Sequence, residues 1–283
     1  MGMTSSGIRD DRVLPVTRGL AAVIVPILTV AFVMLWVFPA ETGRFFSWPV
    51  KPSMSAMMLG ATYLGGAWFF GRVVMARSWH TVTLGFLPVT AFAAILGVAT
   101  VLHWPAFTAG HPSFFLWTVL YVTLPFVLPI VWWRNAAHDP GWAAEDREPV
   151  GDVLRLVVGG LGMVLLTTAL ILVIAPDALI PTWPWTLTPL TARVLGAMFA
   201  LSGVVGLEIA LDRRPGAARA IVQAQAIAVV GILVGLARAG DEVDWSTGTG
   251  SLFVAGMVGV LLANGLAAYG VPGRRRRTGA TLL

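Results

Sequence analysis

Eight long apolar stretches fill most of this chain, and they constrain its fold more than any other feature of the sequence. About 20 helical residues cross the hydrocarbon of a bilayer, and each stretch reaches that length. A continuous stretch in lipid must pair its own backbone polar groups, which requires a helix. The predicted spans are residues 19–39, 54–76, 81–102, 113–134, 154–175, 190–211, 218–237 and 251–270. The sequence therefore predicts an all-α membrane protein with eight transmembrane helices.

The composition agrees with a membrane protein and narrows the chemistry. Apolar residues make up 57% of the chain and charged residues 12%, about half the charged fraction of a soluble domain. The sequence contains no cysteine, which excludes disulfides and thiolate metal sites. It also contains no G-x-S-x-G, H-E-x-x-H, phosphate-loop or dinucleotide-binding motif. We predict no catalytic residue, cofactor or metal site, and an intramembrane enzyme is the least favoured function.

Basic residues near span ends predict the orientation in the membrane. Fifteen of the 19 Lys and Arg residues lie in the two ends of the chain and in alternate connections. The other connections hold only Arg44, Lys51, Arg193 and Arg238. Positive residues concentrate on the cytoplasmic side, so both termini are predicted to be cytoplasmic in the cell inner (plasma) membrane. The same asymmetry predicts contact with anionic lipid headgroups on that face, and not with nucleic acid.

The second half of the sequence repeats the first. Three anchors align residues 14–134 with 149–270, namely Trp48 with Trp185, Gly60 with Gly196, and Trp104 with Trp245. Each half has four spans, so the halves share one orientation and are expected to be related by a pseudo-twofold axis along the membrane normal. The predicted division is a cytoplasmic segment (1–18), a first four-helix repeat (19–134), a polar linker (135–153), a second four-helix repeat (154–270) and a basic tail (271–283).

Arg72 and Glu208 are two ionisable residues at matching depths in the second and sixth spans. Ionisable groups within a membrane are costly, usually face the bundle interior and usually pair. We therefore expect an ion pair between Arg72 and Glu208 across the pseudo-axis. The alternative is that each long side chain extends separately to the headgroups.

A polar cluster on the outer face is a second candidate site. It includes His103, His111, Asp177 and Asp244. Imidazole and carboxylate groups bind divalent cations in many proteins. The favoured interpretation is simpler, because outer loops must be polar and such residues commonly cap helices at the interface.

Interruptions of the spans indicate where a pathway could lie. Pro125 and Asn264 fall at near-equivalent places in the fourth and eighth spans, and Gln223 and Gln225 lie in the seventh. Broken helices at corresponding positions are typical of transporter sites. Close packing of helices through small residues is the alternative explanation.

One sequence pattern resembles uncharacterised polytopic membrane proteins of actinobacterial type. It consists of aromatic residues at the interface, W-P-x-x-P at Trp48–Pro52 and L-G-A at Leu59–Ala61. The resemblance covers most of the chain. Its motifs are structural, so it implies no activity, cofactor or site residue.

Two functions remain in competition at this level. The first is a small-solute or lipid-related transporter or permease component with its pathway between the repeats. The second is a non-catalytic scaffold or assembly subunit that binds a membrane protein partner, or a second copy of the chain, through its spans. The scarcity of polar residues in the spans favours the scaffold over a carrier of hydrophilic solutes. An energised pump would need a partner, because the sequence holds no nucleotide-binding domain.

Overall fold

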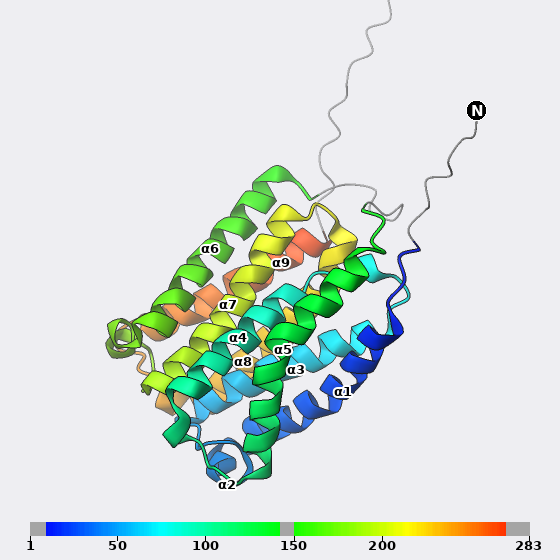
Figure 1. The fold of residues 1–283 in the computed structure, drawn as a ribbon. Coiled ribbons are helices and arrows are strands. Elements are labelled where there is room, and N and C mark those ends of the chain that lie inside the picture. Colours follow the sequence, from blue (N-terminus) through cyan, green and yellow to red (C-terminus); the bar gives the residue numbers. More distant parts are fainter. Residues whose placement is uncertain (1–9, 142–149, 270–283) are drawn as a thin grey trace, which may run out of the picture.

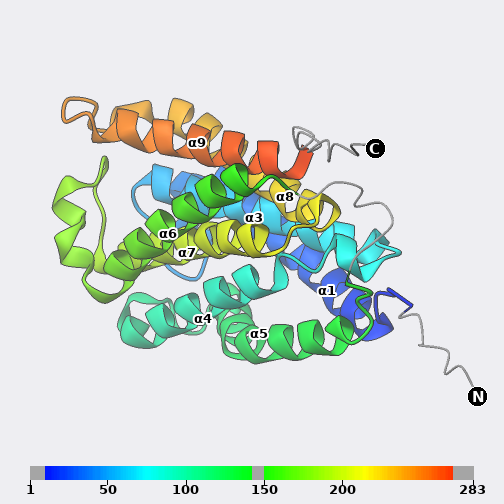
Figure 2. The same cartoon turned by 90° about the horizontal axis from the view of Figure 1, so that it is seen from above.

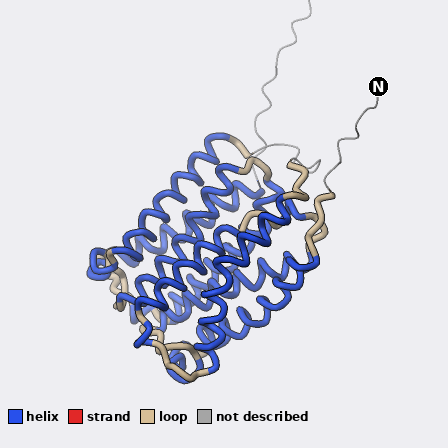
Figure 3. The backbone as a smooth tube through the Cα atoms, in the orientation of Figure 1, coloured by secondary structure: helices blue, strands red, loops and turns tan. Residues whose placement is uncertain are grey.

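The protein is a bundle of long helices in a computed structural model that describes residues 10–141 and 150–269 (Figures 1 and 3). The long helices are α1 (Pro15–Phe32), α3 (Ser53–Met75), α4 (Phe86–Leu102), α5 (Pro112–Ala136), α6 (Asp152–Ile174), α7 (Pro189–Leu211), α8 (Pro215–Arg238) and α9 (Thr249–Tyr269). Short helical segments join them: a π-helix (Val33–Val37), α2 (Thr42–Phe45) and 3-10 helices at Pro39–Glu41, Trp79–Thr81, Trp104–Ala106, Pro176–Ala178, Ile180–Thr182 and Gly240–Glu242. The described residues contain no strand, only an isolated β-bridge between Arg12 and Ser78.

Each long helix coincides with one predicted apolar stretch, and six are long and apolar enough to cross a membrane. These are Pro15–Val37, Pro112–Ala136, Asp152–Ile174, Pro189–Leu211, Gly216–Arg238 and Thr249–Tyr269. Helix α4 is apolar but has only 17 residues, and α3 is long enough but less apolar. The predicted all-α fold is therefore confirmed in the described residues, six helices are consistent with a multi-pass membrane protein, and eight spans stay a prediction.

Helices α3 and α7 form the centre of the bundle, which explains why α3 needs fewer apolar side chains. Most residues of both helices are buried by neighbouring helices, not exposed to the surroundings. Helix α3 packs against α1 and α8, while α7 packs against α6 and α4. Helix α5 then lies against α4, and α9 lies against α8 and α6. Figure 2 shows α5 and α9 on opposite sides, with α3 and α7 between them.

The connections gather at two ends of the bundle. We call the end that holds residues 10–14, 76–85, 137–141 and 212–214 the termini face, because α1 begins and α9 ends there. The opposite end, with residues 38–52, 103–111, 175–188 and 239–248, is the distal face. The predicted tail (271–283) lies outside the described residues, as do parts of the predicted N-terminal segment and linker.

Candidate functional site

An apolar recess with polar residues at its rim lies between α1 and α5, and we call it the α1–α5 groove. Its volume is about 420 Å³. Its lining includes Leu28, Met34, Leu116 and Leu120 along the two helices, and Phe45, Ser47 and His111 at the distal end. A recess of this size and apolarity is typical of sites that take a hydrophobic small molecule.

The groove exists because α1 and α5 meet at one end only. At the termini face the buried side chain of Asn135 joins them, accepting from the Leu14 backbone N–H (3.0 Å) and donating to Thr17 Oγ1 (2.6 Å). Helix α5 contains Pro125 and Pro129, and it changes direction along its length in Figure 1. Proline removes a backbone hydrogen bond and bends a helix, so the two prolines account for this change of direction.

Two buried tyrosines close the inner wall of the groove. The hydroxyl groups of Tyr63 on α3 and Tyr121 on α5 are 2.7 Å apart. Each hydroxyl therefore has a partner in an otherwise apolar region, as buried tyrosines require. Phe92 packs edge-on against both rings and holds them in place.

Two smaller cavities continue inward from the tyrosine pair. The middle cavity, of about 40 Å³, shares Leu28, Tyr63 and Tyr121 with the groove. The central cavity, of about 70 Å³, shares Thr62 and Gly66 with the middle cavity and lies among α3, α7 and α8. The recesses thus form a series from the side of the bundle to its centre.

Of the four residues expected to line a pathway, the structure places one in the lining of a cavity. Gln225 lines the central cavity, and its Oε1 accepts a hydrogen bond from Asn264 Nδ2 at 2.6 Å. Both side chains are buried, and Gln225 Nε2 has no partner. Gln223 instead donates to the Tyr269 hydroxyl (3.0 Å), and Pro125 lies inside α5.

Glu208 does not contact Arg72, so the expected ion pair is not formed. The Gly85 backbone N–H donates to Glu208 Oε2 at 3.2 Å, and Gly85 is the N-cap of α4. No ion pair among the described residues includes Arg72, which is exposed near the end of α3. The N-terminal end of α4 lies beside the Glu208 carboxyl group in the place expected for the arginine.

The four polar residues expected on the outer face do lie on the distal face, but in separate contacts. His111 caps α5 by accepting from the Ser113 N–H, and exposed Asp177 lies in a 3-10 turn. Asp244 accepts hydrogen bonds from Ser246, which hold its pKa below the usual value. No group of three or more such ligands is present in the described parts of the chain.

The fourth of these residues, His103, contacts Arg193 and does not contact the other three polar residues. Its Nε2 lies 2.8 Å from Arg193 Nη1. Partial burial, and then the charge of Arg193, lower the pKa of His103. The neutral ring therefore accepts from the guanidinium, which also donates to the Val173 carbonyl (3.0 Å). This contact joins the connection after α4 to α6 and α7.

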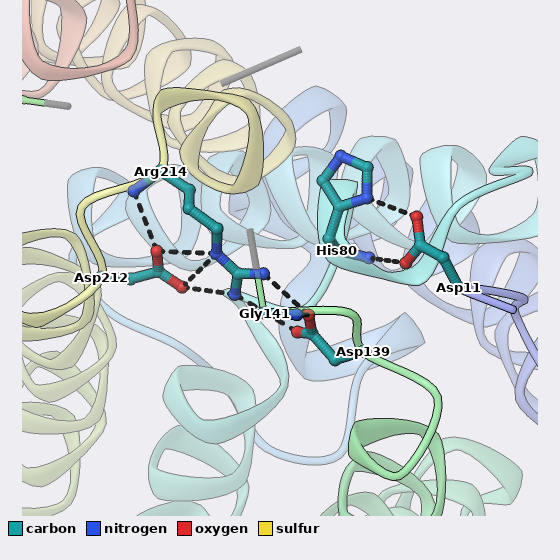
Figure 4. Close-up of polar contacts among 6 residues, drawn as sticks. All are labelled: Asp11, His80, Asp139, Gly141, Asp212 and Arg214. Carbon is teal, nitrogen blue, oxygen red and sulfur yellow. Dashed lines mark hydrogen bonds and ion pairs between the residues drawn. The ribbon is translucent and has the colours of Figure 1, made fainter. Parts of the chain in front are cut away.

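A charged network on the termini face was not predicted from the sequence (Figure 4). Arg214, which is 9% exposed, binds Asp139 (2.8 Å) from the linker and Asp212 (2.7 Å) from its own loop. Burial disfavours the charged guanidinium, but the hydrogen bonds and charges of the two aspartates raise the pKa of Arg214 above its usual value. Beside it, Asp11 accepts from the His80 backbone N–H (3.0 Å) and contacts the His80 ring.

Nothing in the local sequence pattern marks this network, because its members lie in the N-terminal segment and in three separate connections. Asp139 and Arg214 are 75 residues apart. The only available signal is that the linker and the connection before α8 both belong to the same predicted face.

Comparisons of the chain with protein families, with curated proteins and with solved structures found no match.

Proposed function

We propose that this membrane protein binds a lipid in the α1–α5 groove and serves as a lipid-related transporter or permease component. The observation that carries the proposal is the groove itself, which is mainly apolar along its length and, apart from the two tyrosine hydroxyls that bond to each other, has its polar residues at the distal rim. A lipid has the same division, with hydrocarbon chains and one polar end. A groove on the side of the bundle also allows entry from the bilayer without passage through water.

The inner cavities support a hydrophobic occupant over a hydrophilic solute. The central cavity is lined chiefly by apolar side chains such as Met58, Phe69 and Met198. A hydrophilic solute leaving water must regain its lost hydrogen bonds inside the protein. Few groups are available for this, because most buried polar side chains already bond to the protein.

We further propose that all eight long helices cross the membrane as two repeats. Exchanging α1, α3, α4 and α5 with α6, α7, α8 and α9 reproduces the main helix contacts: α1–α3 becomes α6–α7, α4–α5 becomes α8–α9, and α4–α7 becomes α8–α3. Helix α4 packs against α7 of the other half, and α8 packs against α3 of the other half, so the proposed repeats interlock. A pseudo-twofold axis passing between α3 and α7 accounts for this pattern.

Hydrogen bonds at matching positions give independent support for the repeat. On the distal face, the Thr108 N–H donates to the Ser47 carbonyl (2.9 Å), and the Asp244 N–H donates to the Pro184 carbonyl (2.7 Å). Each bond ties the connection after the third helix of a half to the segment before its second helix.

Arginine side chains repeat the pattern at the termini face. Arg18 donates to the Ala76 carbonyl (2.8 Å), and Arg155 donates to the Ala210 carbonyl (2.7 Å). Both bonds join the start of a first helix to the end of a second one. The groove breaks the symmetry, because α6 and α9 pack against each other where α1 and α5 leave a recess.

The proposed orientation, with the termini face in the cytoplasm, has a direct test in this chain without cysteines. Single cysteines at Ala137 on the termini face and Thr247 on the distal face are expected to react oppositely in intact cells. A membrane-impermeant maleimide should label Thr247→Cys and spare Ala137→Cys until the cells are permeabilised. Labelling of Ala137→Cys in intact cells would reverse the orientation.

Lipid occupancy of the groove is tested by filling it. Leu120, which lines the groove, is replaced by tryptophan, and the full chain is purified in mild detergent. Native mass spectrometry then counts the lipids that remain bound. We expect Leu120→Trp to retain about tenfold less lipid, which corresponds to about 1.4 kcal/mol of binding free energy.

The matched control is Leu170→Trp, which adds the same ring to an exposed position on α6 away from the groove. It should retain as much lipid as the natural chain. Equal lipid in all three proteins would overturn the proposal and favour the alternative, a scaffold whose exposed apolar faces bind a membrane protein partner.

A further inference from the structure

We infer that the occupant of the α1–α5 groove is a lipid with an anionic phosphate headgroup, bound at the distal mouth by Arg44 and Ser47. The inference rests on the proposed function, because it assigns the headgroup of the lipid proposed for that groove. It comes from the charges and unpartnered polar groups at the mouth, and not from the apolar lining.

Arg44 lies at the mouth of the groove and is held there by groove residues. It belongs to α2 and is exposed, and its guanidinium carbon is 5.0 Å from the centre of the Phe45 ring. Phe45 itself lines the groove. The Arg44 carbonyl accepts a hydrogen bond from His111 Nε2 (3.0 Å), so the cap of α5 fixes α2 beside the opening. These contacts place the backbone of α2 and the guanidinium beside Phe45, at the distal end of the groove.

Arg44 has no acidic partner in the part of the chain that the structure describes. None of the ion pairs within 4.0 Å in the described ranges includes it. The other distal-face arginines are occupied, since Arg193 binds His103 and Arg238 lies 4.7 Å from the Trp36 ring and donates to the Trp36 carbonyl. A cation without a partner at the rim of an apolar groove attracts an anion that also carries hydrocarbon.

Ser47 supplies a second polar group in the same place. Its side chain is fully buried and lines the groove, and its Oγ has no hydrogen-bond partner. Buried hydroxyl groups are nearly always hydrogen-bonded, so an unpartnered one in a cavity wall indicates a missing acceptor. A phosphate oxygen accepts from both a serine hydroxyl and a guanidinium, and arginine binds phosphate in a bidentate manner.

The test compares two lipids that differ in charge but have the same acyl chains. The full chain is placed in nanodiscs with equal amounts of phosphatidylglycerol and phosphatidylcholine, extracted in mild detergent, and analysed by native mass spectrometry. The natural chain should retain about fivefold more phosphatidylglycerol, the ratio expected from one arginine near an anionic headgroup. Arg44→Gln should retain both lipids equally. Lys51→Gln, which removes another exposed distal-face cation outside the groove lining, should keep the preference.

The outcomes separate this inference from the proposed function. Equal retention of the two lipids by the natural chain, or an unchanged preference in Arg44→Gln, overturns the anionic headgroup and leaves the groove as a lipid site. A phosphatidylglycerol preference that survives in Leu120→Trp places the anion on the outer surface of the bundle and also overturns the inference. If Leu120→Trp and the natural chain retain the same total lipid, the proposed function itself fails.

Discussion

The Gly162→Leu variant is expected not to accumulate as a folded protein. Gly162 lies where α6 and α7 approach closely, and a Cβ added there would be 2.8 Å from the Gly203 carbonyl oxygen and 3.2 Å from the Leu207 backbone nitrogen. These are backbone atoms of a neighbouring helix and cannot rotate away. Over-packing costs about 1–3 kcal/mol where side chains can adjust, and more where backbones must separate. A leucine side chain would force α6 away from α7.

Gly160 provides the matched control, because it lies on the same helix two residues earlier and a Cβ added there would meet no atom within 4 Å. Gly160→Leu should express and unfold like the natural chain, apart from a small gain from better helix propensity. The measurement is the yield of monodisperse protein in detergent, followed by thermal unfolding of whatever is recovered. Similar behaviour of the two variants would show that contact between α6 and α7 is not what makes Gly162 necessary.

The positions of the long helices could be predicted from the sequence, because a membrane span is determined by local composition. Every predicted stretch contains one long helix, and Pro189 begins α7 as expected for a residue that lacks a backbone N–H. The polar character of the distal connections could also be predicted. These features depend on residues that are neighbours in the chain.

The partners of those helices could not be predicted in the same way. Apolar stretches do not specify which neighbour they face, and the packing of α4 on α7 and of α8 on α3 joins segments distant in sequence. The depth of Glu208 was predicted, but its contact was not. Depth follows from distance along the helix, whereas the contact with Gly85 depends on helix rotation and on where α4 begins. The groove could not be predicted either, because it lies where α1 and α5 do not pack against each other.

Replacing Arg214 by leucine should give the second large effect, a loss of about 3 kcal/mol in the free energy of unfolding. The side chains of Arg214 and Asp139 are only 10% and 15% exposed, and that of Asp212 is 19% exposed. Removing the guanidinium leaves two carboxylates together in a partly buried place. Breaking such a pair by removing one partner costs several kcal/mol, because the remaining charge is uncompensated. Thermal unfolding in detergent, followed by helix signal, measures the loss.

Arg213→Leu is the control for Arg214→Leu, since Arg213 is the exposed neighbour and no described hydrogen bond or ion pair uses its side chain. Its replacement should change stability little. Arg214→Lys distinguishes charge from geometry: it keeps the positive charge but not the planar fork that reaches Asp212 and Asp139 at once. We expect Arg214→Lys to recover part of the loss. Equal destabilisation by Arg213→Leu would contradict the network, whereas full recovery in Arg214→Lys would show that charge alone connects the linker after α5 to the loop before α8.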